Sequence, residues 1–399
     1  MRKQLEFLGL VAFFSLCLGA AFGGGYYVRA WSAEYPALRW DLPGLPAAAD
    51  YPLLAEARAL LLQHFNGPLP EARAQEYGLI RGYVGAFDDP YTVFVEPPAA
   101  ELQSQALQGD YGGIGVELSV NAAGAIELKP FPDSPAEAAG LQAGDLLIRV
   151  DDQTITPDMT LDAVTALVRG LVGTPVRITV RRADGAEPQF TITRQSVPLP
   201  SATWTLVAGQ PEVGLIAINR FSDRTAEEVA RAGRELTAQG ARRFVLDLRN
   251  NGGGLLDSAV EVAGQFLDGG VVMYETSRAG PERTFTAPVT GGPLTRVPLA
   301  VLVNGNTASA AEILAGALLD RERAPLIGQP TFGKGSVQYV FPLSDGSSLH
   351  VTANLWFTPA RREFTQGGLP PSLAVEPAAD GQDAELAQAV QYLAEHTQP

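Results

Sequence analysis

Cysteine and histidine are almost absent from this sequence. The only cysteine is Cys17, in an apolar N-terminal segment, and the three histidines in 399 residues are His64, His350 and His396. One thiol cannot form a disulfide within the chain or a cysteine zinc site, and its position leaves no cysteine nucleophile. The histidines are far apart, with no second ligand at helical or turn spacing. We therefore expect chemistry without a metal ion or any other cofactor.

Positive charge is also scarce. The chain has 29 Lys and Arg against 44 Asp and Glu, a net charge of −15. Such a balance repels phosphate backbones, which excludes nucleic acid as a partner. Hydrophobic residues make up 46% and charged residues 18%, with 42 glycines and 30 prolines spread along the chain. At about 150 residues per domain, this composition predicts a folded protein of two to three domains.

The N-terminal segment is uncharged for 22 residues, from Phe7 to Val28. A run of this length suits a secretory signal or one membrane-spanning helix. Small residues within it would permit cleavage, whereas Tyr26 and Tyr27 suit the interfacial belt of an uncleaved anchor, which we favour. We expect residues 1–30 to export the chain to the cell envelope, either the periplasm or the extracytoplasmic face of the membrane. The proline-rich residues 31–50 then form a linker.

Residues 51–107 read as an N-terminal helical segment. Apolar residues recur at steps of three and four from Leu53 to His64, and a second apolar pattern runs from Ala72 to Phe87. The first pattern predicts an amphipathic helix with His64 as a core or boundary residue.

Short strands and tight turns follow, with one helix at 161–171. A Gly-Ile-Gly-Val loop precedes Ser-Pro-Ala-Glu-x-Ala-Gly-Leu-x-x-Gly-Asp, and this order of motifs resembles a PDZ domain over residues 108–197. In a PDZ domain the free N–H groups of the loop bind a C-terminal carboxylate while the peptide adds a strand. The resemblance implies a peptide site at Gly113, Ile114, Gly115 and Val116. An alternative, in which the glycines serve only a turn and a bulge, stays open.

Apolar strand-like runs alternate with helical patterns over residues 198–378, which predicts a layered α/β core. Three glycines, Gly252 to Gly254, separate a strand pattern from a helix pattern, so their N–H groups point into a cleft. No Lys-Ser/Thr pair follows them and the dinucleotide spacing is absent, which favours an oxyanion hole over a phosphate loop. A purely structural glycine turn remains the alternative. Residues 379–399 are predicted to form a C-terminal helix and tail.

Ser309 begins a further predicted helix after the strand at 299–303. Its spacing to Glu312 makes a capping box, in which the hydroxyl only accepts a backbone N–H. A serine at a helix start also lies near the positive end of the helix dipole and near the N–H of Ala310, a setting that suits a nucleophile.

No histidine is suitably placed to activate this serine, because His396 lies in the tail and His350 in an ordinary strand pattern. Lysines are scarce, and Lys334 lies in an apolar, glycine-rich segment where desolvation would lower its pKa. A neutral Lys334 would deprotonate Ser309, and Gln338, four residues on and on the same face of a strand, would orient the lysine. A solvated turn lysine is the alternative.

Together these features resemble the carboxyl-terminal processing peptidases, also called tail-specific proteases, over residues 51 to 375. The shared features are the segment Gly82 to Thr92, the inserted PDZ domain, Asp247 to Gly254, Ala308-Ser309-Ala310, Phe332 to Gly335, and the 25-residue gap from Ser309 to Lys334. The resemblance implies a crotonase/ClpP-like α/β peptidase core with an inserted PDZ domain and an N-terminal helical segment. It also implies that Ser309 is the nucleophile, Lys334 the general base and Gln338 its orienting residue, with backbone N–H groups of Gly253 and Ala310 as the oxyanion hole.

The sequence therefore predicts an ATP-independent serine endopeptidase of the C-terminal processing type. Its expected partners are exported protein substrates with accessible C-termini, recognised or gated by the PDZ domain, and the membrane through the N-terminal segment; a homo-oligomer stays open. Two alternatives are a catalytically silent PDZ scaffold and an acyl-CoA enzyme on the related crotonase fold. The intact Ser309, Lys334 and Gln338 argue against the first. Export and the lack of a nucleotide-binding signature argue against the second.

Overall fold

The computed structural model describes residues 51–396, except residues 122, 157, 278–279, 290, 363, 365–366, 377 and 379–381. The predicted signal or anchor and the predicted linker lie outside the described residues. The chain divides into two compact units, residues 1–74 and 75–399. No helix in the described part of the chain is long and apolar enough to cross a membrane.

In the first unit, α2 (Pro52–His64) carries an apolar surface that is open to solvent. None of its residues is buried, and Leu53 is 78% exposed and Leu61 62% exposed. The prediction that His64 is a core or boundary residue is wrong, because its side chain is exposed as well. The apolar spacing predicted the helix but not what would cover it. The next helix, α3 (Ala72–Gly85), begins at the unit boundary.

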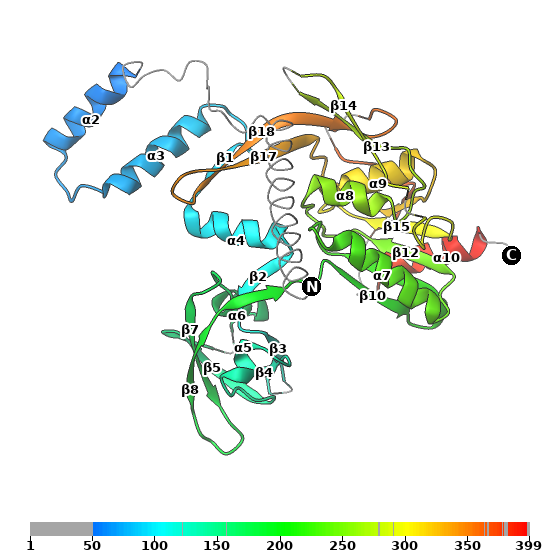
Figure 1. The fold of residues 1–399 in the computed structure, drawn as a ribbon, viewed down its shortest axis with the longest axis horizontal. Helices are drawn as coiled ribbons and strands as arrows, with labels where there is room; N and C mark the ends of the chain where they lie inside the picture. The colour runs from blue at the N-terminus through cyan, green and yellow to red at the C-terminus, as the bar shows by residue number, and fades with distance from the viewer. Residues whose placement is uncertain are drawn as a thin grey trace, which may run out of the picture. The chain divides into compact units, whose positions relative to one another are not determined.

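The core of the second unit is built on a six-stranded sheet (Figure 1). In spatial order its strands are β10 (Ala202–Val207), β11 (Gln210–Ile218), β12 (Arg243–Asp247), β15 (Leu299–Val303), β16 (Leu326–Gly328) and β19 (Leu373–Ala374). The first pair is antiparallel, and each later pair is parallel. Because parallel strands end at the same edge, the loops after β12 and β15 meet there.

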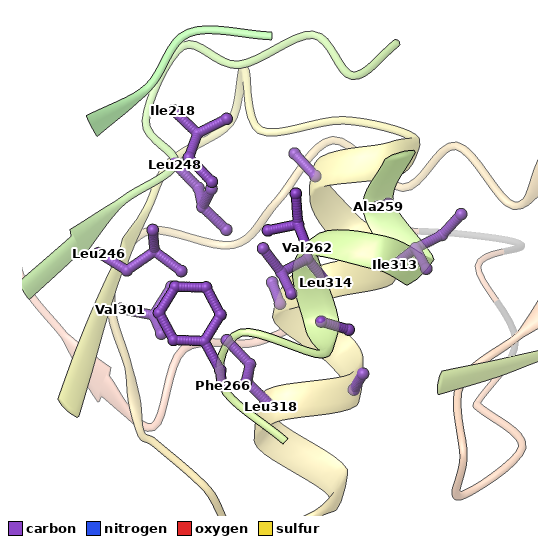
Figure 2. Packing of buried hydrophobic residues seen from close by; sticks show 14 of the residues in the cluster. Ile218, Leu246, Leu248, Ala259, Val262, Phe266, Val301, Ile313, Leu314 and Leu318 are labelled. Atoms are coloured by element: carbon purple, nitrogen blue, oxygen red, sulfur yellow. The ribbon is translucent and has the colours of Figure 1, made fainter. Parts of the chain in front are cut away.

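Helices cover both faces of this sheet, as the alternation of side chains along its strands requires. Leu246 and Val301 pack with α7 (Thr225–Ala238), α8 (Leu256–Ala263) and α9 (Ala310–Asp320). Figure 2 shows this side, where Ala259 and Val262 of α8 and Leu314 and Leu318 of α9 lie near the strand residues. On the other face, Val245 and Leu302 pack with α10 (Ala384–Glu395). Burial on both faces explains why these strands read as continuous apolar runs.

A second, antiparallel sheet brings the N-terminal part of this unit against the C-terminal part. Its strands are β1 (Val93–Val95), β13 (Val271–Ser277), β14 (Arg283–Thr286), β17 (Ser336–Pro342) and β18 (Ser348–Phe357). The long strand β18 pairs with β1, β13 and β17. The residues just before β1 therefore lie beside the segment that carries Lys334.

The unit predicted to be a PDZ domain has its own sheet and core. Its elements are β3 (Val116–Val120), β4 (Ile126–Pro130), α5 (Pro135–Ala138), β5 (Asp145–Val150), β6 (Gln153–Thr154), α6 (Leu161–Val168), β7 (Pro175–Arg181) and β8 (Gln189–Thr193). A ribbon of β2 (Asp110–Gly113) and β9 (Gln195–Pro198) brackets it, and α4 (Pro97–Leu107) precedes β2.

Candidate active site

Ser309 lies in the turn between β15 and α9, in a strained conformation. Its backbone angles are φ 57° and ψ −120°, a combination that residues other than glycine rarely adopt. The turn is held by Thr307, whose hydroxyl donates to the Leu248 carbonyl oxygen at 2.8 Å. The Asn304 N–H donates to the Thr307 hydroxyl oxygen at 3.0 Å. The surrounding hydrogen bonds thus impose the strain, which is typical of a functional turn.

The buried Glu312 carboxylate connects the turn that carries Ser309 (the serine turn) to the segment that carries Lys334 (the lysine segment). It accepts the N–H of Ser309 at 2.9 Å and the N–H of Lys334 at 2.9 Å on one oxygen. The other oxygen accepts the N–H of Gly333 at 2.7 Å and the hydroxyl of Thr331 at 2.6 Å. The Glu312 N–H itself donates to the Ser309 carbonyl oxygen at 2.8 Å. Ser309 and Glu312 thus stand in the predicted capping-box positions, and the Glu312 side chain of this box also holds the segment around Lys334.

The glycine loop after β12 lies directly against Ser309. Gly253 has φ +101°, and a Cβ there would lie 2.9 Å from the Ala308 carbonyl oxygen and 2.9 Å from the Ser309 Cβ. The Ala308 N–H donates to the Asn251 carbonyl oxygen at 2.9 Å, which joins the two loops. Only glycine fits at position 253, and this close approach brings the loop to the serine.

The two N–H groups predicted to form the oxyanion hole differ in whether they already have an acceptor. The N–H of Ala310 is at the first position of α9, where an intrahelical acceptor is lacking. The N–H of Gly253 already donates to the side-chain oxygen of Asn251 at 2.8 Å. The Asn251 amide nitrogen donates to the Ile218 carbonyl oxygen at 2.8 Å, so this buried side chain is fixed at both ends.

Lys334 precedes β17 and is held in place by its backbone and side chain. The Trp356 indole N–H donates to the Lys334 carbonyl oxygen at 2.8 Å. The Lys334 ammonium donates to the Gln338 side-chain oxygen, and the Gln338 amide donates to the carbonyl oxygen of Tyr91. The lysine nitrogen also lies 4.8 Å from the centre of the Tyr91 ring. Lys334 is outside the strand and the register shifts between Val337 and Gln338, so a bulge, rather than simple strand alternation, brings the pair together.

The electrostatic surroundings of Lys334 work in both directions. Burial lowers its pKa below the usual value for lysine, while the negative charges of Asp89 and Glu312 oppose that shift. The pKa of His350 is also lowered, by burial and then by the positive charge of Lys334. A lowered pKa makes the neutral form of a lysine easier to reach, and the neutral form can accept a proton, as a general base must.

All five residues predicted for catalysis line one cavity of about 510 Å³. They come from the glycine loop, the start of α9, and the segment from Lys334 into β17; the five are Ser309, Lys334, Gln338, Gly253 and Ala310. Apolar side chains such as Leu255, Ile313 and Val337 form much of the remaining wall. The cavity is large enough to take part of an extended peptide.

The four predicted PDZ residues also share a cavity. Gly113, Ile114, Gly115 and Val116 line a hollow of about 170 Å³ together with residues of α6. Gly115 has φ +73°, and a Cβ there would lie 2.5 Å from the Cβ of Ser134. The loop therefore needs glycine both for its backbone angle and for space.

Sequence reasoning missed several groups at the catalytic cavity. The sequence predicts Glu312 only as the capping partner of Ser309, Tyr91 only as part of a family segment, and His350 only as a residue of an ordinary strand. His350 and Arg220 line the cavity, whereas Tyr91 reaches the lysine pair from the segment before β1. No local pattern signals these positions, since each depends on contacts between distant parts of the chain. Within the described residues, no group of three or more His, Cys, Asp and Glu side chains could hold a metal ion.

Comparison with known proteins gives two family matches. Peptidase family S41 matches residues 212–375, and the PDZ domain matches residues 131–182. The carboxyl-terminal-processing protease of Synechocystis sp. is 38% identical over 309 residues, which cover 76% of this chain and 72% of the relative. That of Picosynechococcus sp. is 37% identical over 321 residues, covering 79% and 77%. The carboxy-terminal processing protease CtpA of Bacillus subtilis is 32% identical over 308 residues, covering 75% and 63%.

Proposed function

Because this chain belongs to peptidase family S41 and is a serine peptidase of the carboxyl-terminal-processing type, we propose that Ser309, Lys334 and Gln338 form its catalytic site. One observation carries the proposal. Ser309 lines the same cavity as Lys334, whose pKa is lowered by burial and whose ammonium group is bonded to Gln338. The arrangement combines a nucleophile, a proton acceptor and a group that orients the acceptor.

The reaction is acyl transfer in two steps. The Ser309 oxygen attacks the scissile carbonyl carbon while Lys334 takes the hydroxyl proton, and the peptide C–N bond breaks as Lys334 gives that proton to the leaving amine. Water then attacks the acyl-enzyme ester, with Lys334 as its base, and releases Ser309 and the acid product. The N–H of Ala310 and the N–H of Gly253 stabilise the oxyanion in both steps.

The structure implies what must move for this reaction. Lys334 now donates to Gln338 and has to turn towards Ser309. The Gly253 N–H now donates to Asn251 and has to donate to the substrate oxygen instead. Lys334 can keep its hydrogen bond to Gln338 while its lone pair faces Ser309, and Gly253 exchanges one hydrogen bond for another, so substrate binding can complete the site without rebuilding the fold.

Cleavage of an unfolded protein by the full-length chain, without ATP and with a metal chelator, tests this assignment. We expect Ser309→Ala and Lys334→Ala each to lose at least about 10³-fold in kcat/KM. His350→Gln is the matched control, because this side chain lines the same cavity but has no role in the proposed reaction, and it should retain activity within a few-fold. If His350→Gln lost activity and Lys334→Ala retained it, His350 would be the general base. A folded but inert wild-type protein would favour the silent PDZ scaffold.

We further propose that the hollow between the Gly115 loop and α6 binds the C-terminal end of the substrate. The free N–H groups of a PDZ loop suit a carboxylate, and the apolar Ile114, Val116 and Val168 suit an apolar last residue. Measuring cleavage of one substrate with a free and with an amidated C-terminus tests this binding. Slower cleavage of the amide is expected, and equal rates would contradict carboxylate capture.

Export and membrane anchoring through residues 1–30, and a place in the cell envelope, remain proposals based on the uncharged run Phe7 to Val28. Fractionation of cells with a protease-protection assay would test both.

Self-association is a third proposal, supported by the exposed leucines of α2, since a short helix with apolar residues on several sides needs a cover. Sedimentation of the full-length chain beside a Leu53→Ser/Leu61→Ser variant would test it; equal masses for a monomeric wild type would contradict it.

A further inference from the structure

The lining of the catalytic cavity differs in composition from the acidic protein around it. The chain as a whole carries 44 acidic residues and a net charge of −15. Among the described residues, those that line the cavity include no Asp or Glu, and the ionisable nitrogen bases in the lining are Arg220, Lys334 and His350. In so acidic a protein, a peptide cleft whose described lining holds a guanidinium and no carboxylate is a local site for an anion.

Arg220 is the member of this set with unused hydrogen-bonding capacity. One of its five N–H groups donates to the Ala106 carbonyl oxygen, in the last turn of α4, at 3.1 Å. In the part of the chain that the structure describes, no Asp or Glu oxygen lies within the 4.0 Å of an ion pair to it. Its side chain is half-buried, and its pKa is lowered by burial and then by the positive charge of Arg169. A half-buried guanidinium beside a second cation is stabilised by an anion.

The position of Arg220 places it next to the reacting groups. The following residue, Phe221, donates its N–H to the Gly253 carbonyl oxygen at 3.0 Å and accepts the N–H of Leu255 at 2.9 Å. Arg220 is thus attached, through one residue, to the loop that holds the proposed oxyanion donor. Its side chain and Ser309 line the same cavity.

We propose that Arg220 binds a carboxylate of the peptide substrate, so that the cleft prefers peptides with a carboxylate close to the scissile bond. A guanidinium presents paired N–H donors in the geometry of a carboxylate, which gives both charge and orientation. This inference rests on the proposed peptidase function. The site is separate from the PDZ hollow, whose lining does not include Arg220.

The carboxylate has two sources, an Asp or Glu side chain or the C-terminal carboxylate itself. Two sets of peptides distinguish them in the full-length protein. The first set consists of pairs that are amidated at the C-terminus and differ by Glu or Gln, placed in turn at each of the three positions on either side of the cleaved bond. The second set is one pair that has no acidic side chain and differs only by a free or an amidated C-terminus. Values of kcat/KM are measured for wild type, Arg220→Gln and Arg220→Lys.

Arg234→Gln is the matched control, because it removes the same charge from an exposed residue of α7 that does not line the cavity. We expect wild type and Arg234→Gln to prefer the acidic member of at least one pair by about tenfold. Arg220→Gln should reduce that preference, taken as the ratio of the two kcat/KM values of a pair, to less than about twofold, and Arg220→Lys should lie between, because it keeps the charge but loses the paired donors. A preference that survives Arg220→Gln belongs to another site, such as the PDZ loop, and overturns the proposal, as does the absence of any preference in wild type.

Binding separates this proposal from the peptidase assignment. The affinity of the same peptides is measured by fluorescence anisotropy with Ser309→Ala and with Ser309→Ala/Arg220→Gln, neither of which needs to cleave. A carboxylate preference of about tenfold that is lost with Arg220 supports the proposal even if wild type proves inert. Equal affinities of the two variants for every peptide refute it even if wild type is an active peptidase.

Discussion

Glu312 offers the sharpest test of how the site is assembled. Its carboxylate is fully buried and accepts four hydrogen bonds, two on each oxygen, from Ser309, Lys334, Gly333 and Thr331. Glu312→Gln keeps the shape but replaces one acceptor oxygen by an NH₂ group that faces two donors. An unsatisfied buried donor costs about 1 to 3 kcal/mol, so the substitution destabilises this region by about 2 to 6 kcal/mol. The lower value applies if the Thr331 hydroxyl rotates and accepts from the new amide.

The assay has to be local, since a chain of several domains need not unfold in one transition. Hydrogen exchange followed by mass spectrometry reports the N–H groups of Ser309, Gly333 and Lys334 directly. A loss of about 2 kcal/mol in local opening free energy speeds their exchange by at least about tenfold. Because both reacting residues lose their anchor, kcat should fall by at least about 10²-fold, as it does when reacting groups are misplaced by about 1 Å.

Glu322→Gln is the matched control, an exposed glutamate in the turn just after the same helix. It should leave both the exchange rates and kcat unchanged. If Glu312→Gln behaves like this control, the carboxylate does not tie the serine turn to the lysine segment, and the reasoning is refuted.

Four further outcomes follow from the structure. Cleavage needs neutral Lys334, so kcat/KM should rise with pH through the pKa of Lys334. The Asp89 charge raises that pKa, so Asp89→Asn should move the rise to lower pH, whereas Asp88→Asn, at an exposed residue, should not. A pH profile that Asp89→Asn leaves unmoved would contradict the electrostatic account. Gly253→Ala places a Cβ 2.9 Å from the Ser309 Cβ and should lower kcat by about 10²-fold or more, while Gly252→Ala, where a Cβ meets nothing within 4 Å, should cost far less; equal losses would exclude the close approach as the cause. Arg249→Gln breaks ion pairs at 2.7 Å to Asp247, Asp383 and Glu385 and should destabilise α10 by about 3 to 5 kcal/mol in hydrogen exchange, unlike the exposed Arg242→Gln. Arg249 lowers the pKa of Asp383, so that part of the stability is present at neutral pH and lost as the pH falls through the lowered pKa; a pH-independent α10 would contradict this linkage.

The predicted fold class is confirmed, and the reason lies in the side-chain periodicity. Runs such as Leu299–Val303 pack on both faces and read as continuous apolar stretches, while α7 and α8 show the three- and four-residue spacing of helices. The PDZ unit was recognisable because its loop and turn motifs follow in a fixed order. The family match and the named relatives agree with the processing-peptidase resemblance.

The site was predictable only as far as local motifs reach. Ser309 and Lys334 each lie in a recognisable turn, and their roles came from the resemblance rather than from geometry. The contact of Gln338 with Tyr91 joins positions 247 residues apart, and the one between Glu312 and Lys334 joins positions 22 apart on different elements. Pairing of β1 with β18 and the approach of the two loops create these contacts, and periodicity carries no information about them. The same holds for α2, whose pattern predicted a helix but not its exposed surface.

The most direct test of a Ser-Lys peptidase is to find where an acyl group goes. The full-length protein is mixed with an activated ester of an N-acyl leucine, and mass spectrometry of the digested protein locates the acyl group, for wild type beside Lys334→Ala and Ser309→Ala. The account predicts acylation of Ser309 in wild type, acylation slowed by at least about 10³-fold in Lys334→Ala, and none at this position in Ser309→Ala. An acyl group on a different residue, or acylation of Ser309 at an undiminished rate in Lys334→Ala, would contradict it.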